Sequence, residues 1–305
     1  MRPNTVVSLP GMARPQLRPR WPGRLLAILA LLLVPALIVA GTPSDAAESR
    51  LFGDSGASGN AAALWGKIDC ATAERHRQVL AGGDPRPDPT DGVVGATAYR
   101  RLTVFDDDDV YGERCELGLN DWREGPTALY REGQRRVTTV TLRLPASFPL
   151  GAKRWQTVVQ MKQAQPSAGG GGSPMIQLLA FNGHWHLSVA TNHNVQTWTR
   201  WRGYARRNTW VRFSFNVLYS RHHRRGVVRL RADLNGDGDF RDRKERAGPY
   251  HGTTLKREIG GGGEDGLSRG SSIPSHLRVG IYHDEPIRCP DGCSIHVDSV
   301  HVSSG

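Results

Sequence analysis

Short runs of alternating apolar and polar residues dominate the chain from about residue 97 onward. Because successive side chains of a β-strand point to opposite faces, each run predicts a strand with one buried and one polar face. The runs cover residues 135–145, 154–163, 208–220, 226–240, 275–285 and 293–304. Residues 174–192 add two strands around an Asn182-Gly183 turn, a pattern typical of a β-hairpin. With no long amphipathic helix among them, these runs predict an all-β antiparallel sandwich or jelly roll.

Four of the strands carry polar faces rich in cationic, amide and aromatic side chains. If the apolar alternates face the core, the opposite faces present Gln156, Val158, Gln160 and Lys162; His184, His186, Ser188 and Asn192; Trp210, Arg212, Ser214 and Asn216; and His276, Arg278, Gly280 and Tyr282. Cations suit carboxylates, and aromatic rings suit the faces of sugar rings. Any one such strand is more simply a solvated sheet face, but four together favour one concave groove for an acidic sugar chain. The expected ligand-binding residues are Arg278, Tyr282, Arg212, Trp210, Asn216 and His186.

The first 46 residues have the organisation of a secretory signal peptide. A basic segment without acidic residues precedes an apolar run at 25–41, and small residues surround Ala46. A retained membrane anchor is the alternative, although Pro35 interrupts the apolar run. Cleavage would place the protein outside the cell or at its surface with no membrane span. We then expect an N-terminal extension with loops at 47–96 and the β domain at 97–305.

The chain carries a formal net charge of +11, which favours polyanionic partners. Acidic polysaccharide, teichoic acid, extracellular nucleic acid and membrane surfaces all fit that charge. No recognised nucleic-acid-binding module accompanies it, so specific nucleic-acid binding is not expected. We expect a monomer that binds acidic polysaccharide.

Four cysteines, an even number in an exported chain, suggest two disulfides. The sequence CPDGC closes a very small loop, so we pair Cys289 with Cys293 and, by elimination, Cys70 with Cys115. A zinc site of four thiolates is a weaker alternative, since the chain has no pair of CxxC knuckles.

One loop resembles a calcium-binding sequence. In DLNGDGDFRDRKE, residues 233–245, Asp233, Asn235, Asp237 and Asp239 alternate as in the D-x-N-x-D-G loop. Lys244 stands where an EF-hand has its glutamate, and the loop follows a strand. A structural calcium ion and a metal-free turn are equally compatible with this pattern.

Three motifs resemble those of jelly-roll polysaccharide lyases. ERCELGLN (113–120) is similar to their R-x-E-L motif, and WQTVVQMKQ (155–163) to their Q-I-H strand, with Gln160 in the glutamine position. HLRVGIYHDE (276–285) is similar to Y-x-K-x-G-x-Y, with Arg278, Gly280 and Tyr282 in matching places. The resemblance covers about residues 97–304 and points to the heparin lyase I, glucuronan lyase and alginate lyase group. It implies a concanavalin-like β-jelly roll.

The resemblance also implies β-elimination on a uronic acid. Arg114 and Gln160 would bind and neutralise the substrate carboxylate, with Glu116 orienting the arginine. Lys162 and His276 stand where the family has its histidine and its catalytic tyrosine, so one or both would have to act as acid or base. Tyr282 lies six residues along the same strand from His276, which makes it a poor substitute. We therefore expect a secreted lyase of a uronic-acid-containing polysaccharide; the alternative is a non-catalytic carbohydrate-binding protein on the same scaffold.

Overall fold

The computed structural model describes residues 49–56, 60–80, 98–119, 129–164, 173–191, 197–259 and 268–305. All of them belong to one unit, residues 46–305. The predicted signal peptide lies outside the described residues. Within the described residues, no helix combines the length and apolar character needed to cross a membrane.

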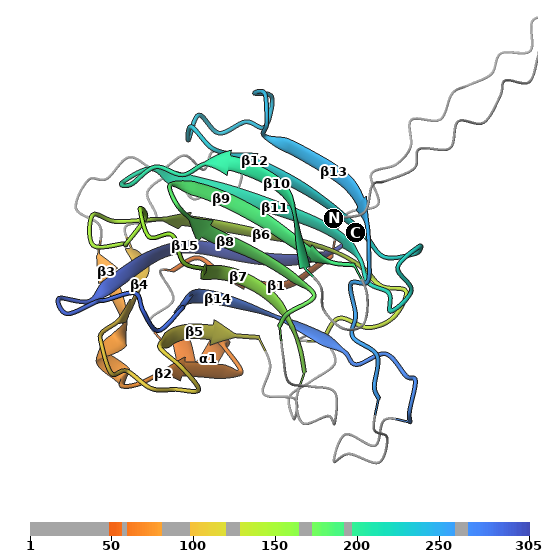
Figure 1. Cartoon of the computed structure of the whole chain (residues 1–305), viewed down its shortest axis with the longest axis horizontal. Coiled ribbons are helices and arrows are strands. Elements are labelled where there is room, and N and C mark those ends of the chain that lie inside the picture. Colours follow the sequence, from red (N-terminus) through yellow and green to blue (C-terminus); the bar gives the residue numbers. More distant parts are fainter. Residues whose placement is uncertain are drawn as a thin grey trace, which may run out of the picture. The chain divides into compact units, whose positions relative to one another are not determined.

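Two antiparallel sheets form the fold (Figure 1). The eight-stranded sheet has the order β13 (Arg246–His251), β12 (Val227–Asp233), β11 (Trp210–Leu218), β6 (Arg135–Arg143), β15 (Cys293–Ser304), β4 (Ala98–Val104) and β3 (His76–Leu80), and β1 (Arg50–Asp54) also pairs with β15. The seven-stranded sheet has the order β10 (Thr197–Tyr204), β9 (His184–Ala190), β8 (Ile176–Phe181), β7 (Gln156–Gln163), β14 (Ser275–His283), β5 (Arg114–Gly118) and β2 (Lys67–Cys70). Helix α1 (Ala61–Leu64) and the 3-10 turn η1 (Ala73–Arg75) are short. The predicted β-jelly-roll sandwich is confirmed.

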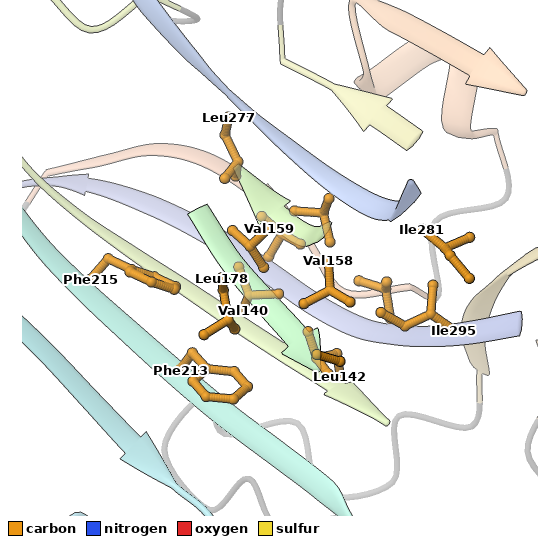
Figure 2. Packing of buried hydrophobic residues seen from close by; sticks show 14 of the residues in the cluster. Val140, Leu142, Val158, Val159, Leu178, Phe213, Phe215, Leu277, Ile281 and Ile295 are labelled. Carbon is orange, nitrogen blue, oxygen red and sulfur yellow. The ribbon is translucent and has the colours of Figure 1, made fainter. Parts of the chain in front are cut away.

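Apolar side chains from both sheets fill the space between them. Phe213 and Phe215 of β11 lie in one buried cluster with Leu178 of β8 and with Leu277 and Ile281 of β14 (Figure 2). These five side chains are fully buried, and burial of each stabilises the fold by about 1.5–3 kcal/mol. The core therefore accounts for the apolar half of the alternation and leaves the polar half on the outer faces of the sheets.

The predicted hairpin and both predicted disulfides are present. Asn182 (φ 47°) and Gly183 (φ 76°) connect β8 to β9 through the left-handed backbone that a tight hairpin turn requires. Cys70 and Cys115 join β2 to β5 at directly paired positions. Cys289 and Cys293 close the small loop before β15.

Two features differ from the sequence-based expectations. Residues 50–80 were expected in an extension with loops, but they contribute β1, β2 and β3 to the two sheets. The strand predicted at 208–220 forms β11 of the eight-stranded sheet, whereas the strands at 154–163, 184–192 and 275–285 form β7, β9 and β14 of the seven-stranded sheet. Sequence alternation defines the faces of a strand, but it does not say which sheet the strand joins.

Candidate active site

The outer face of the seven-stranded sheet holds a cavity of about 550 Å³. This volume is in the range of small-molecule and substrate sites. The lining residues are Arg114, Trp155, Thr157, Gln160, Lys162, Ser173, Pro174, Gln177, Leu179, Ser188 and Tyr282. Four of the residues singled out from the sequence, Arg114, Gln160, Lys162 and Tyr282, therefore meet at one site.

Strand register brings these residues together from β5, β14, β7, β8 and β9. Side chains at directly paired positions of neighbouring strands lie on the same face, about 5 Å apart. One row of paired positions crosses the sheet through Gly118, Arg278, Gln160, Gln177 and Ser188. A second row runs through Arg114, Tyr282, Thr157, Leu179 and His186. The two rows form the floor of the groove.

A β-bulge in β7 changes which of its residues face the groove. The register shifts between Thr157 and Val159, so Thr157 lines the cavity. Val158, which strict alternation placed on the polar face, is fully buried in the core. Gln156 is also buried and donates a hydrogen bond to the carbonyl of Pro149 at 3.0 Å. The expected groove positions of Gln156 and Val158 are therefore wrong.

Gly280 allows β14 to pack closely against β5. A Cβ atom at this position would lie 2.2 Å from the backbone oxygen of Cys115, well inside van der Waals contact. The absence of a side chain here keeps the register that places Tyr282 opposite Arg114.

Glu116 is buried at the centre of the site and organises three of its donors. Its carboxylate accepts a hydrogen bond from the amide of Gln160 and lies 3.5 Å from a guanidinium nitrogen of Arg114 and of Arg278. The Arg114 guanidinium in turn lies 3.7 Å from the ring centroid of Tyr282. The expectation that Glu116 orients Arg114 agrees with these contacts. One buried carboxylate thus fixes both arginines and Gln160.

Arg278 is held from a second direction by Asp69 of β2. Its Nη1 lies 2.5 Å from an Asp69 carboxylate oxygen, and Lys67 lies 3.3 Å from the other oxygen. Asp69 and Arg278 are both buried, so each charge needs its partner. Nothing in the motif pattern of the sequence pointed to Asp69.

His276 contacts the site through Arg278. Its side chain is buried, and its Nε2 accepts a hydrogen bond from Nε of Arg278 at 3.1 Å. Burial and the charges of Arg278, Lys67 and Lys162 lower its pKa well below the usual value. A neutral imidazole bonded in this way carries its proton on Nδ1, which has no partner among the described hydrogen bonds. His276 is therefore placed to position Arg278 and is not among the residues that line the cavity.

Lys162 lines the cavity, and the pKa of its amine is lowered. Burial is the largest cause that lowers its pKa from 10.5 to about 8, and the charge of Arg278 comes next. Arg114 and Lys256 lower the pKa further, while Glu116 opposes the shift. Roughly a tenth of this amine is unprotonated at pH 7 and can accept a proton.

Three residues expected in the groove lie elsewhere. Trp210, Arg212 and Asn216 belong to β11, whose alternate residues Val211, Phe213, Phe215 and Val217 face the core. They therefore lie on the outer face of the other sheet, and the expectation that they share this groove is wrong. His186 is on the groove face, in the same row as Tyr282, but beyond the residues that line the cavity.

In the loop that resembles a calcium site, the carboxylates bond to the backbone. Asp233 is buried and accepts hydrogen bonds from the backbone N–H groups of Gly236, Asp237 and Gly238. Asp239 forms a salt bridge with Arg241. In the part of the chain that the structure describes, no group of three or more His, Cys, Asp or Glu side chains is arranged to hold a metal. Structural calcium binding stays a prediction.

Several lining residues were missed from the sequence. Gln177 and Leu179 alternate on β8 and could have been found by applying the same period of two to that half of the hairpin. Trp155 lies just before β7, and its ring packs edge-on against Tyr282 with 4.8 Å between centroids. The predicted run at 154–163 includes Trp155, but its alternation gave this residue the same face as Thr157, which was expected in the core.

Solved structures of carbohydrate-active enzymes are among those that are similar to this chain. The endo-β-1,4-glucuronan lyase of the fungus Trichoderma reesei is 14% identical, with a TM-score of 0.57 over 84% of this chain and 96% of that one. A GH131 β-glucanase catalytic domain from Podospora anserina has a TM-score of 0.45 and 10% identity over 79% and 84%. Alginate lyase A1-II′, of polysaccharide lyase family 7, has a TM-score of 0.43 and 12% identity over 77% and 85%. The first likeness supports the fold, and the other two are too distant to carry an argument.

The family assignment rests on the sequence itself. No curated protein matches the chain. A family model described as polysaccharide lyase matches residues 83–301, which include the three motifs and every strand from β4 to β14. The chain therefore belongs to the polysaccharide lyase family of carbon–oxygen lyases that act on polysaccharides.

Proposed function

We propose that the protein is a secreted lyase that cleaves a uronic-acid-containing polysaccharide by β-elimination. The observation that carries this proposal is the meeting of Arg114, Gln160, Lys162 and Tyr282 at one cavity. Two of these residues suit a carboxylate, and Lys162 can move a proton. Two disulfides support an oxidising compartment outside the cytoplasm.

Elimination needs the substrate carboxylate to be neutralised first, because the proton on the neighbouring ring carbon is weakly acidic. Arg114 is the cation for this step, since its guanidinium can pair with a planar carboxylate through two parallel hydrogen bonds. Glu116 and the ring of Tyr282 hold the guanidinium in place. The amide of Gln160 lies beside it on the same buried carboxylate.

Lys162 is the base in this proposal. The neutral amine of Lys162 removes the proton from ring carbon five, and the carbon–oxygen bond at carbon four breaks as the double bond forms. The ammonium group that results returns the proton to the departing oxygen. His276, through its hydrogen bond to Arg278, supports the site without touching the substrate.

The test is ultraviolet absorbance of the purified protein with glucuronan, alginate, heparin, hyaluronan and pectate. β-Elimination creates a double bond conjugated to the carboxylate, so turnover raises the absorbance. Arg114→Ala should abolish the increase, whereas Lys153→Met, an exposed change in the β6–β7 connection, should leave it intact. Hydrolysis without the new absorbance, or no cleavage of any acidic polymer, would contradict the proposal.

A further inference from the structure

The groove face of the seven-stranded sheet continues past the cavity to its far edge, where a second group of side chains gathers. His184 and His186 of β9 and Arg202 and Tyr204 of β10 lie at paired positions, Arg202 opposite His186 and Tyr204 opposite His184. Lys244, from the loop between β12 and β13, lies with its Nζ 5.3 Å from the centre of the Tyr204 ring. We name these five residues the β10 cluster.

Strand register aligns the β10 cluster with the proposed reaction site. The row that contains Tyr282 crosses β7 at Thr157, β8 at Leu179 and β9 at His186, and it ends at Arg202. From β14 to β10 there are four strand spacings, about 19 Å in all. A polysaccharide that crosses the strands along this row reaches the β10 cluster several sugar units away from the bond that breaks.

The β10 cluster has the chemistry to hold one acidic sugar. The side chain of Tyr204 is 62% exposed, and its ring packs on His184 with 4.9 Å between centroids. An exposed ring held by neighbouring side chains can stack against the apolar face of a pyranose. Arg202 is also exposed, and its guanidinium lies 2.9 Å from Nδ1 of His184.

Within the part of the chain that the structure describes, neither Arg202 nor Lys244 forms a salt bridge, although the loop that carries Lys244 also holds Asp242 and Glu245. Burial, with the charges of Arg202 and His184, lowers the pKa of His186, as expected where cations gather. Trp201 fixes the loop that carries Lys244 by donating a hydrogen bond to the Lys244 carbonyl at 2.7 Å. Two cations held beside an exposed aromatic ring fit a sugar that carries a carboxylate better than they fit a neutral sugar.

We infer that the β10 cluster is a distant subsite for a uronate residue of the same polysaccharide chain, with Arg202 on the carboxylate and Tyr204 against the ring. The inference rests on the proposed function. The subsite makes the enzyme favour long chains, because only a chain that spans the sheet reaches both the cavity and the β10 cluster.

The experiment compares kcat/KM on the polymer with kcat/KM on a ladder of its oligosaccharides. Arg202→Ala and Tyr204→Ala should each lower kcat/KM about tenfold on the polymer and the longest oligosaccharides, mainly through KM. The shortest cleaved oligosaccharide should react at the wild-type rate. Arg229→Ala removes an exposed arginine from β12 of the other sheet and should change neither value. Equal losses at all lengths, or no loss on the polymer, would overturn the inference.

Affinity electrophoresis in gels that contain the acidic polymer separates this inference from the proposed function. If the wild-type protein is retarded but produces no unsaturated product, the lyase mechanism fails, and loss of retardation in Arg202→Ala still supports the subsite. Unchanged retardation in both variants overturns the subsite, whatever the outcome of the lyase assay. A wild-type protein that no acidic polymer retards overturns both. A neutral polymer in the gel is the matched control.

Discussion

Replacing Lys162 by methionine should stabilise the protein and abolish its activity. The folded protein lowers the pKa of this amine from 10.5 to about 8, mainly because the amine is buried. Each pKa unit corresponds to about 1.4 kcal/mol, so the charged amine costs the folded state up to about 3 kcal/mol. Methionine keeps the unbranched chain without the charge and removes that cost.

The pH dependence of this gain has a definite sign. Between pH 8 and 10.5 the unfolded chain holds the proton that the folded protein has lost, so the stability of the wild-type protein rises with pH across that interval. The advantage of Lys162→Met is therefore full below pH 8 and disappears towards pH 10.5. Urea unfolding at pH 7 and pH 10, with Lys153→Met as an exposed control, measures the two values.

The pH dependence of activity should report the same lowered pKa of the Lys162 amine. At pH 7 a pKa of about 8 leaves roughly a tenth of the amine neutral, against about one part in three thousand at the ordinary value. The kcat/KM of the wild-type enzyme should rise tenfold per pH unit up to about pH 8 and then level off. Lys162→Arg keeps a charge without a usable base and should lose about 10²–10⁴-fold. A variant Lys162→Met that is less stable at pH 7, or that keeps most of its activity, would refute this reasoning.

Three further substitutions test the contacts that hold the site residues in place. Replacing Cys70 and Cys115 by serine opens a link across 45 residues and should lower the free energy of unfolding by about 4 kcal/mol, as urea unfolding would show; a loss below about 1 kcal/mol would contradict this. Gly280→Ala should cost about 1–3 kcal/mol by forcing β14 from β5, and an unchanged melting temperature would count against the close contact. His276→Ala frees Nε of Arg278 and should raise KM about tenfold while the pH limb near 8 remains; disappearance of that limb would make the histidine the base.

Local patterns in the sequence predicted the strands, the Asn182-Gly183 hairpin and both disulfides, because each depends on residues close in sequence or on the count of cysteines. The meeting of Arg114, Gln160 and Lys162 could be anticipated from the family motifs. These features need no knowledge of which strands are neighbours.

The other features of the fold and the site depend on pairing between strands that are far apart in the sequence. Trp210 belongs to a strand with the expected polar face, but that strand joins the other sheet. The bulge in β7 moves Val158 into the core, and no local rule on alternation reveals a bulge. A second bulge, between Thr199 and Trp201, breaks the alternation of β10, and this strand, which carries Arg202, was missed.

The short strand β2 shows that the family match and the folding unit have different boundaries. The match begins at residue 83, whereas the carboxylate of Asp69 and the sulfur of Cys70 come from before it. A protein begun at residue 83 would present a free thiol at Cys115 and a buried Arg278 with one of its two carboxylates missing. Recombinant work on this enzyme should therefore keep the chain from residue 49 onward, since the segment ahead of the recognisable domain holds Arg278 and Cys115 in place.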